Sequence, residues 1–169
     1  MIISYLRKAG WFVGLMLLQV LILNNIHIAG YATPFLYIYL ILKFESDISR
    51  NTVMLWAFCL ALLIDVFSDT PGMNAVAAVT IAFLRPFFLR LFAPRDTLDN
   101  IVPSIASMGF SPFLKFLIVS VFVHHTILLS IEYFSFVHWG TLLLKIVASS
   151  SLTVICILAL EGMKIGRAS

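Results

Sequence analysis

The stretch VMLWAFCLALLIDVFSDTPGMNAVAAVTIAFLRPFFLRLF, residues 53–92, consists of two long apolar runs joined by one short turn. The first run extends from Val53 to Phe67 and the second from Ala75 to Phe92. Both are close to the length of about 20 residues that a membrane-spanning helix needs. Pro71 and Gly72 lie between them and are typical turn residues. The stretch therefore predicts a hairpin of two transmembrane helices.

Composition places the rest of the chain in the membrane as well. Of 169 residues, 62% are hydrophobic and 11% are charged, with a mean hydropathy of +1.06; soluble domains have about 45–50% apolar and about 25% charged residues. Six spans would use about 120 residues, which leaves no room for a soluble domain. We therefore predict a single transmembrane domain over residues 1–169 and exclude a separate nucleotide-binding, catalytic or DNA-reading module.

Four further apolar runs bring the number of expected spans to six. They are Trp11 to Leu23, Tyr31 to Phe44, Pro112 to Ile131 and Thr141 to Leu160. The second run is the weak one, because its apolar core from Pro34 to Leu42 is shorter than a span usually is. The span must therefore include Ile26 to Tyr31, cross where the bilayer is thinned, or fail to cross.

The distribution of positive charge indicates the orientation of these spans. With six spans, the three loops on one side carry no Lys or Arg, and cytoplasmic loops are the ones enriched in these residues. We therefore predict an all-α integral membrane protein with six transmembrane helices and both termini cytoplasmic. If the second run did not cross, the count would be seven to two. The nine basic residues that six spans place on one side are Arg7, Lys8, Lys43, Arg50, Arg90, Arg95, Lys115, Lys164 and Arg167.

A signal peptide is the alternative at the N-terminus. Arg7 and Lys8 precede an apolar run, and Gly30-Tyr31-Ala32 is similar to a cleavage site. Cleavage there would leave five spans.

Several polar residues fall at membrane depth, where charged side chains are costly and need partners. Counted inward from the outer ends of their spans, Asp65 lies about 4 Å deep and Gln19 and Lys145 about 7 Å deep. Arg85 lies near the cytoplasmic end, where its side chain is expected to reach the headgroups. The others form either an outward-facing polar pocket or structural pairs such as Asp65 with Lys145. This predicted polar layer consists of Gln19, Asp65, Lys145, Glu132 and one of the two residues His124 and His125.

Small residues indicate where helices approach closely. Gly10 and Gly14 form a GxxxG pattern in the first span, and Ala57 and Ala61 recur every four residues in the third. A terminal helix is more often peripheral, so we assign the Gly10 and Gly14 face to a partner helix. Outside the spans, Thr97 to Met108 has apolar residues at helical spacing and predicts an interfacial helix, although Pro103 interrupts it.

No enzyme motif is present in the sequence. HExxH, GxSxG and the P-loop glycine pattern are all absent, so catalytic residues and cofactors are not expected. His124 and His125 with Asp65 or Glu132 lack a diagnostic metal-ligand spacing, and we expect no metal. The two cysteines lie inside apolar runs and predict neither a disulfide nor a zinc site.

The hairpin carries a more specific pattern over residues 62–75, LLIDVFSDTPGMNA. An apolar helix ends in Asp65, a turn follows with Pro71 and Gly72, and Asn74 opens the next helix. This pattern resembles the signature of the bacterial rod shape-determining MreD family. The glycine usual before the Asp-bearing run is replaced, with Ala61 the nearest small residue.

The resemblance extends over the rest of the chain. It includes residues 19–24 at the end of the first span, His124 and His125 in the fifth span, Glu132 at its end, the length and the number of spans. It implies a non-enzymatic component of the bacterial inner membrane that serves cell elongation and peptidoglycan synthesis. The implied partner is MreC, and through it RodA, a penicillin-binding transpeptidase and MreB.

The same family is similar in fold to the S components of energy-coupling vitamin transporters, so a second hypothesis stands beside the scaffold. A scaffold is expected to have short loops, external interaction faces and a filled interior. A binder of a small molecule taken up from outside is expected to have an outward-opening cavity of about 300 Å³ or more, lined by the polar layer.

Overall fold

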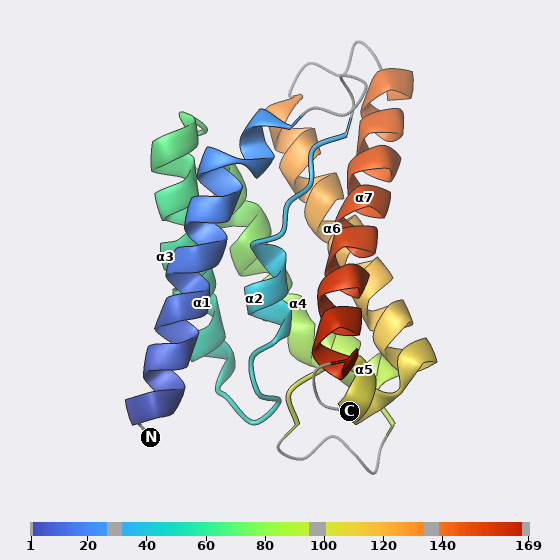
Figure 1. Ribbon diagram of the computed structural model, residues 1–169. Helices are drawn as coiled ribbons and strands as arrows, with labels where there is room; N and C mark the ends of the chain where they lie inside the picture. Colours follow the sequence, from blue (N-terminus) through green and yellow to red (C-terminus); the bar gives the residue numbers. More distant parts are fainter. Residues whose placement is uncertain (1, 27–31, 95–100, 134–138, 167–169) are drawn as a thin grey trace.

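The computed structural model describes residues 2–26, 32–94, 101–133 and 139–166, and this part of the chain is predominantly helical. Its long helices lie side by side along one axis (Figure 1). They are α1 (Ile2–Leu21), α3 (Arg50–Ser68), α4 (Met73–Phe92), α6 (Phe110–Glu132) and α7 (Trp139–Gly166). The shorter elements are η1 (Leu23–Asn25), α2 (Ile38–Leu42) and α5 (Ile105–Met108).

Among the described residues, four helices are long and apolar enough to cross a membrane. They are α3, α4, α6 and residues Trp139–Lys164 of α7, with 19, 20, 23 and 26 residues. At 1.5 Å per residue these lengths correspond to roughly 28–39 Å, against a hydrocarbon core of about 30 Å. The chain is therefore an all-α, multi-pass membrane protein.

The second predicted span is not a continuous helix. Its only helix is α2, with five residues from Ile38 to Leu42, and residues 32–36 before it are not helical. Pro34 supplies a local reason, because proline has no N–H and disfavours helical backbone at the residue before it. Tyr31, like Gly30 of the cleavage-like triplet, lies outside the described residues.

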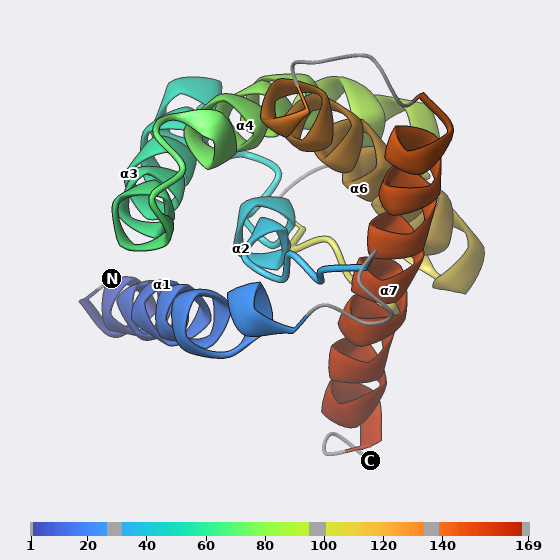
Figure 2. The same ribbon diagram turned by 90° about the horizontal axis from the view of Figure 1, so that it is seen from above.

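This broken segment lies in the middle of the bundle. Seen from above, α2 is surrounded by α1, α3, α4, α6 and α7 (Figure 2). Every residue from Pro34 to Leu42 is buried. Backbone that is not helical is tolerated at membrane depth only where protein or water surrounds it, and here the five long helices provide the protein.

Small side chains are buried on α3 and α4, which pack against each other. Ala57 and Ala61 of α3 and Ala75, Ala78 and Ala82 of α4 are all buried, with exposed fractions of 5% or less. Their spacing of three and four residues places them on one face of each helix, where they let the two backbones approach closely.

The helix expected over Thr97 to Met108 is present only at its end, because residues 101–104 are not helical and α5 covers Ile105–Met108. Only α5 is helical, and it begins directly after Pro103 and Ser104. Ser104 caps this single turn, and Gly109, with φ +84°, separates it from α6. Residues 97–100 lie outside the described residues.

Candidate functional site

Asp65 joins the two helices of the α3–α4 hairpin. Its carboxylate is 2% exposed and accepts four hydrogen bonds. Oδ1 accepts from Thr70 Oγ1 at 2.9 Å and from the backbone N and Nδ2 of Asn74 at 3.0 and 2.9 Å. Oδ2 accepts from the backbone N of Ala75 at 2.9 Å. The first N–H groups of a helix have no partner inside it, so Asp65 caps α4 from across the turn.

The turn itself depends on two residues with left-handed backbone. Asp69 ends α3 with φ +53°, and Gly72 precedes α4 with φ +79°. Glycine adopts this conformation without the steric cost of a Cβ. Pro71 is exposed and has no N–H to donate to the carboxylate. Pro71 and Gly72 therefore shape the turn, while Asn74 makes the contact with Asp65.

Gln19 satisfies the backbone of the broken segment. The side chain is fully buried; Oε1 accepts from the backbone N of Leu36 at 2.9 Å, and Nε2 donates to the carbonyl O of Pro34 at 3.0 Å. Nε2 also donates to Asn24 Oδ1 at 2.8 Å. The two backbone groups belong to the stretch that forms no helix, so Gln19 replaces the hydrogen bonds that a helix would have provided.

Two hydroxyl groups of α7 also accept hydrogen bonds from backbone N–H groups of the broken segment. Ser149 Oγ accepts from the backbone N of Thr33, and Thr153 Oγ1 accepts from the backbone N of Phe35, both at 3.1 Å. His125 lies against Thr153, with Nε2 3.2 Å from Oγ1. Its other ring nitrogen, Nδ1, is 2.8 Å from the carbonyl O of Val121. One polar side chain of α1 and two of α7 thus hold residues 33–36 between them.

Tyr37 links this segment to the hairpin. Its hydroxyl donates to Asn74 Oδ1 at 3.1 Å and lies 2.7 Å from Nε2 of His124. A tyrosine hydroxyl has one proton, so donation to Asn74 goes with the His124 tautomer that carries its proton on Nε2. A buried chain of contacts therefore runs from His124 through Tyr37 and Asn74 to Asp65.

The predicted pairing of Asp65 with Lys145 is wrong. The ammonium group of Lys145 donates to the hydroxyl of Tyr133 and lies 4.4 Å from the centroid of its ring. Lys145 and Glu132 do share one cleft, of about 210 Å³, where α6 ends and α7 begins. Gln19, Asp65 and the two histidines do not line it. The structure thus divides the predicted polar layer into a bonded interior and a small cleft where α6 ends and α7 begins.

Arg85 does not reach the headgroups as expected. It is 1% exposed, and its guanidinium donates to the carbonyl O of Phe44 and, at 3.5 Å, to that of Glu45. These two carbonyls follow α2, where the chain leaves the bundle interior. Arg85 therefore fixes the lower end of the broken segment.

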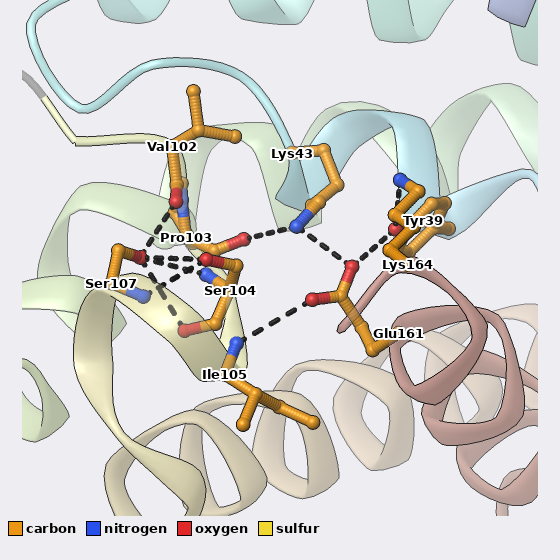
Figure 3. A network of polar contacts seen from close by, with 9 residues as sticks. All are labelled: Tyr39, Lys43, Val102, Pro103, Ser104, Ile105, Ser107, Glu161 and Lys164. Carbon is orange, nitrogen blue, oxygen red and sulfur yellow. Dashed lines mark hydrogen bonds and ion pairs between the residues drawn. The ribbon is translucent and has the colours of Figure 1, made fainter. Parts of the chain in front are cut away.

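A further cluster, which sequence reasoning missed, surrounds Glu161 at the lower end of α7 (Figure 3). Glu161 is 3% exposed; Oε1 lies 2.8 Å from Lys43 Nζ and accepts from the hydroxyl of Tyr39. Oε2 accepts from the backbone N of Ile105 at 3.4 Å. Lys164, one turn away, donates to the Tyr39 hydroxyl at 2.7 Å. The Glu161 and Lys164 spacing of three residues on one helix face was the available signal.

Gly10 and Gly14 lie on the exposed side of α1. Both are exposed, and they line an open groove of about 520 Å³ with Trp11, Leu15 and Leu18. A Cβ placed on either glycine would meet no atom within 4 Å. The groove is therefore empty space on this chain and not a contact between its own helices.

Within the described residues, no group of three or more His, Cys, Asp or Glu side chains is placed to hold a metal ion. Gln19, Asp65, His125 and Tyr37 all contact other groups of the chain. In comparisons with known proteins, no family model, curated protein or solved structure matches the chain. The function must therefore be argued from these contacts.

Proposed function

We propose that the chain crosses the bacterial inner membrane six times with both termini cytoplasmic, and that residues 32–44 form the second crossing. In Figure 1 the start of α1 and the end of α7 lie at the same end of the bundle. Arg50, Arg90, Lys115 and Lys164 belong to helix ends at that end. The excess of positive charge there supports a cytoplasmic location.

Labelling with a membrane-impermeant thiol reagent tests this orientation. In a chain with Cys59 and Cys156 replaced, we expect Pro71→Cys to react from outside intact cells and Asp47→Cys to react only after lysis. Both positions are exposed and lie at opposite ends of the bundle. Reaction of Asp47→Cys in intact cells would overturn the orientation.

The proposed role is that of a non-enzymatic scaffold in the cell-elongation and peptidoglycan-synthesis machinery, as the MreD resemblance implies. The observation that supports it best is the use of the interior polar groups. Gln19, Thr153 and Asp65 bond to backbone of the chain itself, so they hold its fold and leave little for a ligand. A filled interior with an open groove on α1 is what a scaffold needs.

Uptake of a small molecule, the S-component-like alternative, has less support. The cleft that Glu132 and Lys145 line has a volume of about 210 Å³, below the range of about 300–1,000 Å³ usual for small-molecule sites. Of the predicted polar layer, only Glu132 and Lys145 line it.

The groove at Gly10 and Gly14 is the proposed docking face for an MreC-type single-span helix, and through MreC for RodA, the transpeptidase and MreB. Helices in lipid associate mainly by close packing, which small residues permit. The two glycines leave open space at the helix surface.

Gly14→Leu is expected to reduce capture of an MreC-type partner by at least about tenfold, which corresponds to about 1.4 kcal/mol. The unfolding temperature of the isolated chain should stay nearly unchanged, because the new side chain meets open space. Ala61→Leu, at a fully buried site, should instead lower the free energy of unfolding by about 1–3 kcal/mol through overpacking. Co-purification and thermal unfolding measure the two effects.

A further inference from the structure

Two buried polar atoms of α6 have no hydrogen-bond partner among the described residues. They are the hydroxyl oxygen of Ser120 and Nδ1 of His124, and both side chains are fully buried. Buried polar groups are nearly always bonded, either to protein or to an ordered water. The scaffold role proposed above does not use these two atoms.

The two side chains occupy the same face of α6. Residues four apart on a helix are neighbours, with about 5–6 Å between their Cβ atoms. A long side chain on a helix also points back toward the N-terminus, over the turn that precedes it. The imidazole of His124 therefore lies over the turn that carries Ser120. Its far nitrogen, Nε2, is already in contact with the hydroxyl of Tyr37, at 2.7 Å.

The Ser120 hydroxyl is not used in the way that other hydroxyls on these helices are. Thr80, Thr126 and Thr153 each donate to the carbonyl O four residues earlier, all at 2.8 Å. This contact is a common way to satisfy a hydroxyl inside a helix. Ser120 does not make it, so its O–H is left to donate to another acceptor.

The direction of the hydrogen bonds near His124 follows from Asp65. A carboxylate accepts only, so Asn74 turns Nδ2 toward it and Oδ1 toward Tyr37. Tyr37 donates its one proton to Asn74, and its oxygen accepts from Nε2 of His124. The described contacts of His124 include no carboxylate, and a buried cation without a partner is costly. The ring is therefore neutral, and Nδ1 is an acceptor.

Ser120 thus offers a donor and Nδ1 of His124 an acceptor, but the two atoms do not bond to each other. A water molecule between them satisfies both, because water accepts from a hydroxyl and donates to a ring nitrogen. We propose that a buried water bridges Ser120 Oγ and His124 Nδ1. Every donation then runs toward Asp65, through His124, Tyr37 and Asn74. Aligned hydrogen bonds strengthen one another, so Ser120 is a positioning residue for the hairpin.

His125 provides an internal reference for this assignment. Its Nδ1 lies 2.8 Å from the carbonyl O of Val121. A carbonyl can only accept, so Nδ1 of His125 carries the proton. The proposal requires the opposite tautomer at His124, with the proton on Nε2. Two adjacent histidines of α6 should therefore differ in tautomer.

Solid-state NMR of the full chain in lipid bilayers, with isotope-labelled histidine, tests the proposal. His27 and His138 are replaced by asparagine, so that only His124 and His125 contribute signals. The two rings are assigned through their backbone resonances. We expect His124 to carry its proton on Nε2, and we expect magnetisation transfer from water to its Nδ1.

Two variants locate the water. Ser120→Ala removes the donor and should abolish the transfer from water to Nδ1 of His124, because a buried water needs at least about two polar partners. Thr126→Val is the matched control. It removes a hydroxyl of the same helix that is already bonded to the carbonyl O of Phe122, and it should leave the transfer unchanged.

The proposal fails if Nδ1 of His124 carries a proton. It also fails if Nδ1 receives no transfer from water in the wild-type chain, which would indicate a direct bond from Ser120. A third contradicting result is a Ser120→Ala chain that shows the same transfer as Thr126→Val. None of these outcomes bears on partner capture at Gly14, because the measurement uses the isolated chain.

Discussion

Replacing Asp65 with alanine is expected to lower the free energy of unfolding by about 4 kcal/mol, the largest effect of any single change that we consider. The substitution removes an acceptor that serves Thr70, Asn74 and Ala75. Each buried donor that loses its partner costs about 1–3 kcal/mol. The first turn of α4 would then have two N–H groups without an acceptor. Unfolding in mixed detergent micelles measures the change.

Asp47→Ala is the matched control, because Asp47 is an exposed aspartate at the opposite end of the bundle. It should change the free energy of unfolding by less than about 0.5 kcal/mol. A loss of less than about 1 kcal/mol for Asp65→Ala would mean that the hairpin does not depend on this carboxylate.

Gln19→Leu should have a similar effect, about 3–4 kcal/mol, for a different reason. Leucine preserves most of the volume but leaves the N–H of Leu36 and the carbonyl of Pro34 without their partner inside the bundle. Two unpaired backbone groups in a buried, non-helical segment carry a cost of about 1–3 kcal/mol each. The same detergent unfolding experiment applies.

Asn25→Leu gives the comparison for this change. Asn25 is an exposed amide at the end of η1, and among the described residues its side chain bonds only to the carbonyl O of Leu21, at 3.1 Å. Its replacement should cost less than about 1 kcal/mol. If Gln19→Leu and Asn25→Leu lowered the free energy of unfolding equally, the contacts of Gln19 to residues 34 and 36 would stabilise the fold no more than the local contact of Asn25 does.

The long helices could be predicted from the sequence because their apolar runs are long and end in clear turn residues. The run from Val53 to Phe67 became α3 with three more residues at its start, and the run from Ala75 to Phe92 became α4 with two more. The sequence identified Tyr31 to Phe44 as the least certain span, but it did not predict that residues 32–36 are not helical. A short apolar run has the same sequence pattern whether it forms a helix or extended backbone, provided that the segment is buried on all sides.

The depth of each polar residue along its span could be predicted, but the direction in which its side chain points around the helix axis could not. Arithmetic at 1.5 Å per residue placed Asp65, Gln19 and Lys145 at similar levels. Whether two of them meet depends on how each helix is rotated about its axis, which is a property of the packed bundle. Asn74 as a donor to Asp65 was predictable because it lies just across a short turn. Partners such as Leu36 for Gln19 were not, because the extended backbone of the second segment was unknown.

Partner capture by Gly14→Leu tests the central claim most directly, namely that a chain with a self-bonded interior acts through the outer face of α1. The comparison is with Val13→Leu, which adds bulk to a neighbouring exposed position of α1 that does not line the groove. We predict that Gly14→Leu retains at most about a tenth of wild-type capture of an MreC-type helix, while Val13→Leu captures as the wild-type chain does. Full capture by a well-folded Gly14→Leu chain would contradict the account.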